Sequence, residues 1–114
     1  MPNEHTTVDS KVKAALLLLG FPVERVFYQG NADTYIAFRL LLSRDAAFAD
    51  DESTAKEYFY RADIFSKTDY VSLIKRAECV LKAAGFYGIT VSAEIYEKDT
   101  GFYHVPIEFY YMEV

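Results

Sequence analysis

Apolar residues along the chain recur with a helical period in two stretches, and these stretches predict two helices. The first helix is predicted over about Val8–Leu19, and the Gly20 and Pro22 that follow end it. Its apolar stripe is formed by Val8, Val12, Ala15, Leu16 and Leu19. The second helix is predicted over about Asp69–Ala84, where Gly85 ends it. Its stripe is formed by Tyr70, Leu73, Ile74, Ala77, Val80, Leu81 and Ala84.

Alternating apolar and polar residues elsewhere predict five strands. Their approximate ranges are Val23–Tyr28, Tyr35–Ser43, Lys56–Phe65, Ile89–Glu97 and Phe102–Val114. The last two strands flank an EKDTG turn and form a hairpin. Pro106 has no N–H to donate to a neighbour, so the last strand is predicted to lie at an edge of the sheet.

The order of these elements is α-β-β-β-α-β-β, which predicts an α+β fold. We expect a mostly antiparallel sheet of four to five strands with both helices packed on one face. The 114 residues suit a single domain spanning residues 1–114. Residues 1–7 are expected to be flexible, and the acidic segment 44–54 is interpreted as a long mobile loop.

Strand alternation divides the predicted sheet into two faces of different character. The face toward the helices is predicted to carry Ile36, Phe38, Leu40, Leu42, Tyr60, Ala62, Ile64, Val105, Ile107 and Phe109. The opposite face is predicted to carry Tyr35, Arg39, Leu41, Phe59, Arg61, Asp63, Phe65, Tyr96, Glu108, Tyr110 and Met112. Interface cores are enriched in Tyr, Phe, Met and Arg, so this face is interpreted as a protein contact surface. The alternative is an open face held by cross-strand pairs such as Arg61 with Asp63.

Composition restricts the class of function. Ten Tyr and nine Phe exceed the needs of a small core, and Tyr is favoured where one side of a side chain is wet. The net charge of −5 disfavours nonspecific binding to nucleic acid. The single Cys79 is interpreted as a small buried hydrophobe. The first ten residues do not resemble a signal peptide, and no apolar run is long enough to span a bilayer, which predicts a soluble protein of a reducing compartment.

Candidate catalytic chemistry is confined to the stretch DIFSKTDY, residues 63–70. Ser66 and Lys67 are neighbours on a strand end, so their side chains point to opposite faces and Lys67 is badly placed as a base. The spacing of Ser66 and Asp69 instead predicts a helix cap resembling a capping box. The loop carboxylates Asp45, Asp50, Asp51 and Glu52 lack a calcium-loop pattern and are interpreted as a solvated loop. No nucleotide-binding, hydrolase or zinc motif occurs, so we expect no catalytic, cofactor or metal site.

Several segments, taken in order, resemble the tail-completion proteins of long-tailed phages and prophages, also called tail-to-head joining or tail-terminator proteins. The segments are VKAALLLLGFPVERVFY, ADIFSKTDYVSLIKRAECVLKAAGF and YEKDTGFYHVPIEFYYMEV. The shared pattern is an opening helix, a strand ending in aromatic-Ser-Lys, an Asp-started helix with a Gly-Phe exit, and a DTGxYH hairpin before an aromatic strand. The resemblance covers most of the chain from Val12 onward.

This resemblance implies a non-enzymatic virion protein that caps the finished tail tube as a ring, usually sixfold, and joins tail to head. Its partners would be copies of itself, the tail-tube protein and head-connector proteins. No membrane is implied, and DNA would pass through the ring without specific binding, which suits an acidic chain. The protein would reside in the virion tail after assembly in the host cytoplasm. A different neck or head-completion subunit, and a small ligand-binding or RNA-binding α+β module, remain alternatives.

The resemblance transfers no functional residue, so the predicted interface rests on patterning. Its members are Phe48, Asp50, Asp51, Glu52, Phe59, Arg61, Tyr96, His104, Tyr110 and Met112.

Overall fold

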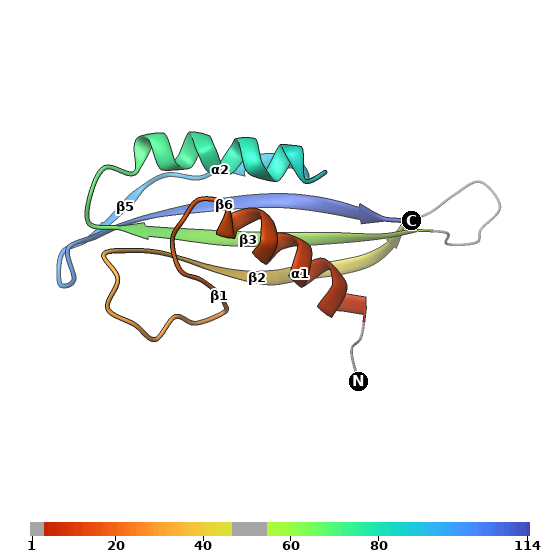
Figure 1. Cartoon of the computed structure of the whole chain (residues 1–114). Coiled ribbons are helices and arrows are strands. Elements are labelled where there is room, and N and C mark those ends of the chain that lie inside the picture. The colour runs from red at the N-terminus through yellow and green to blue at the C-terminus, as the bar shows by residue number, and fades with distance from the viewer. Residues whose placement is uncertain (1–3, 47–54) are drawn as a thin grey trace.

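The computed structural model describes residues 4–46 and 55–114, and it has one layer of sheet and one layer of helices (Figure 1). The elements are α1 (Glu4–Leu17), β1 (Val23–Arg25), β2 (Thr34–Ala46), β3 (Ala55–Ser66), α2 (Val71–Ala83), β4 (Tyr87–Val91), β5 (Ile95–Glu97) and β6 (Phe102–Glu113). The strands form a six-stranded mixed sheet in the order β1-β2-β3-β6-β4, with β5 also paired to β6. The predicted α+β class is confirmed.

Three long antiparallel strands, β2, β3 and β6, form the centre of the sheet. Side chains alternate between the two faces along each strand, so every second residue points toward the helices, and these residues are mostly apolar. Ile36, Ile64 and Val105 lie opposite one another in this way, and all three are buried. The strand β1 is much shorter and pairs in parallel with β2, over Val23 to Arg25.

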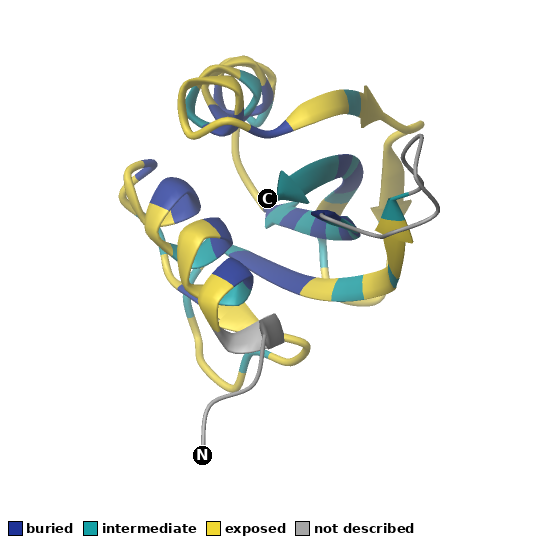
Figure 2. Ribbon diagram, turned by 90° about the vertical axis from the view of Figure 1, so that its right-hand side faces the viewer, coloured by how far each residue is buried: buried dark blue, intermediate teal, exposed yellow. Residues whose placement is uncertain are grey.

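Both helices pack on the same face of this sheet, as the alternation predicts (Figure 2). The predicted stripe of α1 is buried from Val8 to Leu19, whereas Leu17 and Leu18 are exposed. In α2 the buried positions are Leu73, Ile74, Ala77 and Leu81. Cys79 of α2 is exposed, so the prediction of a buried cysteine is wrong: its position faces away from the sheet.

Two tyrosines belong to the core itself. Tyr58 and Tyr60 are fully buried, and their hydroxyl groups reach carboxylates at the rim of the core. Tyr58 donates to Glu113 Oε1 at 3.1 Å, and Tyr60 donates to Asp9 Oδ1 of α1. Burial and then the hydrogen bond to Asp9 raise the pKa of Tyr60.

The prediction that the last strand is an edge is wrong, because β6 lies between β3 and the pair β4 and β5. In an antiparallel strand, the N and the C=O of one residue point toward the same neighbour. The oxygen of Pro106 accepts a hydrogen bond from the Ser92 N–H at 2.9 Å, so the proline nitrogen faces that side as well. The segment that faces Pro106 leaves the strand conformation between the end of β4 at Val91 and the start of β5 at Ile95. The missing N–H of Pro106 is therefore tolerated inside the sheet.

The predicted strand Ile89–Glu97 is accordingly divided into β4 and β5. Val91 pairs with Ile107, and Ile95 pairs with His104. Between these two pairs, the three residues 92–94 therefore lie opposite the two residues 105–106 of β6. This extra residue moves the side chains of β5 to the other face. Tyr96 packs on Tyr103 on the helix side, with ring centroids 4.9 Å apart, and does not join the opposite face as predicted.

A β-bulge in β2 has the same effect on Leu42. Leu40 pairs with Tyr60 and Leu42 pairs with Phe59, which leaves Leu41 as the extra residue. Leu42 therefore lies on the face away from the helices, contrary to the prediction from strict alternation. The strand β2 continues to Ala46, so Arg44 to Ala46 belong to a strand and not to the predicted mobile loop; the rest of that loop, 47–54, lies outside the described residues.

The start of α2 also differs from the prediction. The N-cap residue is Tyr70, which makes no side-chain capping bond. Asp69 Oδ1 accepts the N–H of Val71, the first residue of α2, at 3.0 Å, and Ser66 Oγ accepts the Thr68 N–H at 3.1 Å. Ser66 and Asp69 thus shape the turn into α2, but they form two local turns and not a capping box.

Candidate interaction surface on the open sheet face

The face of the sheet away from the helices has no layer of the described chain packed over it, and we call it the open sheet face (Figure 2). Strand register and the bulge in β2 assign its side chains. They include Tyr35, Arg39, Leu42, Arg44, Glu57, Phe59, Arg61, Asp63, Phe65, Phe102, His104, Glu108, Tyr110 and Met112. Aromatic and charged residues are mixed across three strands.

One end of the open sheet face carries a row of four stacked rings. Tyr28, in the segment after β1, stacks on Tyr35 of β2 with ring centroids 4.4 Å apart. Tyr35 stacks on Phe65 of β3 at 4.7 Å, and Phe65 stacks on His104 of β6 at 4.3 Å. Phe102 contacts Tyr35 edge-on at 5.4 Å. Most ring faces in this row therefore already contact another ring, and few remain free to stack on a ligand.

A charged group lies beside this row. Asp63 Oδ1 accepts from Arg61 Nε at 2.8 Å and lies 2.7 Å from His104 Nε2. The other ring nitrogen of His104, Nδ1, lies 3.8 Å from Glu97 Oε2. His104 is therefore held between two carboxylates. The predicted pair of Arg61 with Asp63 is present, but both residues belong to β3, so it is a pair along one strand and not across two strands.

The other half of the open sheet face carries a second aromatic cluster. Tyr110 of β6 stacks on Phe59 with centroids 4.5 Å apart and on Tyr87 at 5.8 Å. Tyr87 donates its hydroxyl to Glu57 Oε2, and Arg44 Nη2 donates to Glu57 Oε1 at 2.8 Å. The bond from Tyr87 and the Arg44 guanidinium lower the pKa of Glu57. Burial and the same bond raise the pKa of Tyr87 to about 12.

The structure places five residues of the predicted interface together on the open sheet face. They are Phe59, Arg61, His104, Tyr110 and Met112. Tyr96 lies on the helix side, against Tyr103. Phe48, Asp50, Asp51 and Glu52 lie outside the described residues.

Sequence reasoning missed several members of the surface. Tyr28 and Tyr87 were missed because their segments pair only briefly with the sheet, so their faces depend on tertiary contacts. Leu42 was missed because nothing in the alternation of β2 marks the bulge. Arg44 and Glu57 could have been found as an opposite-charge pair across the β2–β3 hairpin, had β2 been extended past Ser43.

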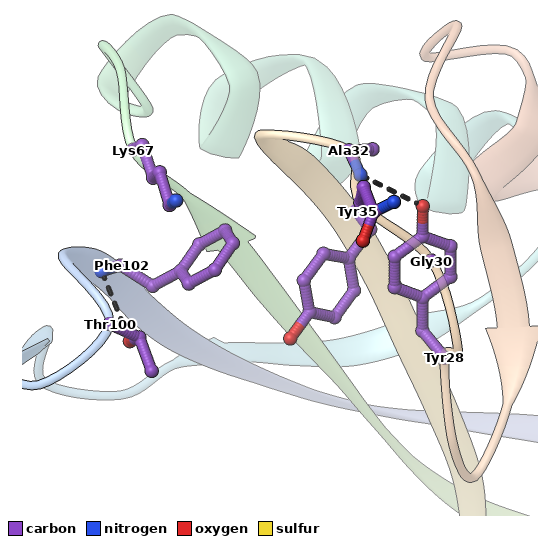
Figure 3. A pocket seen from close by; sticks show the side chains of 8 residues that line it. Tyr28, Gly30, Ala32, Tyr35, Lys67, Thr100 and Phe102 are labelled. Atoms are coloured by element: carbon purple, nitrogen blue, oxygen red, sulfur yellow. Dashed lines mark hydrogen bonds between the residues drawn. The ribbon is translucent and has the colours of Figure 1, made fainter.

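A hollow of about 460 Å³ opens beside the row of rings, between the segment after β1 and the β5–β6 turn (Figure 3). Tyr28 and Tyr35 line one side of it, and Lys67 and Phe102 line the other. The Lys67 ammonium lies 4.9 Å from the centre of the Phe102 ring. Burial, followed by the nearby Glu97, raises the pKa of Tyr35.

The geometry around Ser66 is that of a structural hydroxyl. Ser66 is fully buried, and its Oγ contacts Thr34 Oγ1 at 3.0 Å and Thr68 Oγ1 at 3.2 Å, neither of which is a base. Lys67 is directed toward Phe102, away from Ser66. Within residues 4–46 and 55–114, no three His, Cys, Asp or Glu side chains come together in a way that suits a metal ion. In the same residues, no helix has the length and apolarity needed to cross a bilayer.

No known protein family and no curated protein matches the chain. Among solved structures, it is similar to a chain of the virion of a native gene transfer agent particle, with a TM-score of 0.54 and 14% sequence identity. The similarity covers 93% of this chain and 90% of that chain. At this identity the similarity shows a shared fold across nearly the whole domain.

Proposed function

We propose that this protein is a non-enzymatic virion structural subunit that caps the finished tail tube as a ring and joins tail to head. The observation that carries the proposal is the fold shared with a chain of a gene transfer agent virion over nearly the full length of both chains. The resemblance of its sequence segments to tail-completion proteins supports the finer role. The protein would act in the virion tail, after assembly in the host cytoplasm.

The open sheet face suits contact with other virion proteins. It combines aromatic side chains with Arg39, Arg61 and Met112, and these residue types are enriched in protein interfaces. An RNA-binding role fits less well, because the rings of Tyr28, Tyr35, Phe65 and His104 stack on one another and leave few faces for bases. The net charge of −5 points the same way, and it would let DNA slide through a ring without adhering.

The partners in this proposal are the tail tube on one side and the head connector on the other. We assign Phe59, Arg61, His104 and Met112 to the contact surface, together with Leu42. Tyr110 contributes to the fold as well, since it stacks between Phe59 and Tyr87. Replacing Tyr110 would therefore disturb the sheet and is a poor probe of binding.

The test is complementation of a particle-producing strain from which the gene has been deleted. Deletion should give filled heads separate from tails, with tails unfinished or overlong by electron microscopy, and the wild-type gene should restore joined particles. Particles that assemble normally without the gene would refute the proposal. Unfilled heads with normal tails would instead favour a head-completion subunit.

A variant of the open sheet face tests the surface separately from the fold. Leu42→Glu with Met112→Lys changes two accessible positions of this face, and the urea midpoint should stay close to that of the wild type. The variant should fail to restore joining. The matched control is Leu17→Glu with Leu18→Lys, which changes two exposed apolar residues at the C-terminal end of α1, on the helix side of the sheet, and should complement fully. Equal complementation by both variants would remove the open sheet face from the interface.

A further inference from the structure

The two outer edges of the sheet differ, and each carries an exposed apolar feature. The strand β1 forms one end of the strand order and β4 forms the other. Residues immediately after β1 project at the first edge, and a groove opens beside β4 at the second. A contact between the first edge of one subunit and the second edge of the next is heterologous, which is the kind of contact that closes rings.

The feature at the first edge is formed by Val26 and Phe27, which we call the edge knob. Val26 has a φ of 71°, a conformation that is a genuine outlier for a β-branched residue. The Phe27 N–H bonds back to the Arg25 oxygen at 2.8 Å, and the Val26 N–H bonds to the Phe38 oxygen at 2.7 Å. This γ-turn with positive φ ends β1 abruptly. Phe27 is 68% exposed, which is costly for a benzyl side chain held on a strained turn.

The feature at the second edge is a groove of about 410 Å³ between α2 and the β4–β5 break, which we call the edge groove. It forms because the chain leaves the sheet between Val91 and Ile95, opposite Pro106. Its apolar lining includes Ile74, Val91 and Val105. The charged residues that line it are Lys75, Glu78 and Glu94.

We propose that the edge groove of one subunit receives the edge knob of a second copy of this chain. This inference rests on the proposed ring and names the contact that would close it, in place of the edge at Pro106 that the sequence suggested. The knob is apolar and projecting, and the groove is apolar and large enough for a benzyl and an isopropyl group. Knob and groove lie at opposite ends of one sheet, so no subunit can satisfy both by itself.

Charge favours a second copy as the occupant. Glu24 and Arg25, which precede the knob, are both exposed, and Arg25 remains 52% exposed although its Nε contacts Asp9 at 2.7 Å. The groove presents Lys75 for a carboxylate, and Glu78 and Glu94 for a guanidinium. Residues next to the knob and residues of the groove thus carry opposite charges that can pair when the knob enters the groove.

Cysteine cross-linking tests the contact in the full-length chain. In a Cys79→Ser background, Phe27→Cys together with Val91→Cys should give a ladder of covalent oligomers after mild oxidation of concentrated protein. The control pair, Phe27→Cys with Val114→Cys, has a more exposed second cysteine and should give only background dimers. Absence of the ladder, or an equal ladder from the control pair, would overturn the proposal.

Mixing the single variants tests whether the contact is head-to-tail. Phe27→Cys and Val91→Cys proteins, oxidised together, should give a covalent heterodimer and nothing longer. Each subunit then carries only one cysteine, so it can be cross-linked to one neighbour and not to two. A Phe27→Cys protein that dimerises alone as efficiently as the mixture would show a symmetric contact and contradict the proposal. Sedimentation equilibrium of Phe27→Ala tests the contact without introduced cysteines. The self-association of this variant should be about tenfold weaker than that of the wild type. An unchanged association constant would also contradict the proposed contact.

The outcomes separate this contact from the proposed function. If gene deletion blocks head–tail joining but no ladder forms, the function stands and the ring uses another contact. If deletion leaves particles intact but the ladder forms, the chain self-associates through its sheet edges and the tail-completion role fails.

Discussion

The link between α1 and the sheet through Asp9 offers the sharpest test of how the fold is held. Asp9 Oδ1 accepts the hydroxyl of fully buried Tyr60, and Asp9 Oδ2 contacts Arg25 Nε at 2.7 Å. One carboxylate therefore ties α1 to both β3 and β1. We expect Asp9→Ala to remove both contacts and to leave the Tyr60 hydroxyl buried without its acceptor.

The size of the effect can be estimated from these contacts. A buried donor that loses its acceptor costs about 1–3 kcal/mol, and a charged acceptor places the loss toward the upper end. The exposed ion pair with Arg25 adds about 0–1 kcal/mol. Alanine is the better helix former, which returns about 0.5 kcal/mol. Asp9→Ala should therefore lower the free energy of unfolding by about 2 kcal/mol.

Related variants separate the contributions. Tyr60→Phe removes the hydroxyl donor, so no buried donor is left without an acceptor. It should lower the free energy of unfolding by about 1 kcal/mol. In the double variant, Asp9→Ala should cost about 1 kcal/mol less than it does alone. Asp9→Asn keeps an acceptor oxygen and should fall between the wild type and Asp9→Ala.

Urea unfolding followed by far-UV circular dichroism is a suitable assay, with the midpoint and the slope fitted separately. The matched control is Asp99→Ala, at an exposed position of the β5–β6 turn, which should change the free energy by less than about 0.5 kcal/mol. An Asp9→Ala cost no larger than this control, or a double variant whose cost is the simple sum, would refute the reasoning.

Three further predictions concern single positions. Gly88→Ala should destabilise the protein by more than Gly101→Ala in a urea titration. Both glycines have positive φ, but of the two only Gly88 would place a Cβ 2.7 Å from a ring carbon of Tyr110. Equal destabilisation by the two substitutions would show that the Tyr110 ring moves freely. The folded pKa of Tyr87 lies above its unfolded value, so its bond to Glu57 stabilises fully below about pH 10 and is lost as pH rises through about 12; in a spectrophotometric titration, the tyrosine that ionises near pH 12 should disappear in Tyr87→Phe. Cys79 is exposed on α2 and should react with a maleimide in the native state nearly as fast as in urea, whereas protection of more than about tenfold would mean that another surface covers it.

The sequence by itself determined the elements of this protein and the identity of its core. Helical and strand periods depend on residues close in the chain, so the buried stripe of α1 and the inward residues of β3 could be read directly. The same periods placed Phe59, Arg61 and Met112 on one face, away from the helices. No catalytic arrangement was expected around Ser66 and Lys67, and that rested on the same local geometry of a strand end.

Tertiary structure decided what depends on neighbours. Pro106 lacks an N–H on only one side of β6. The chain on that side is interrupted between β4 and β5, so β6 can lie inside the sheet. A bulge adds a single residue that local alternation does not reveal, so Leu42 and Tyr96 changed faces. The row of rings from Tyr28 to His104 joins four segments far apart in the sequence. The edge knob and the edge groove are features of where the sheet ends, and that is fixed only when all of its strands are paired.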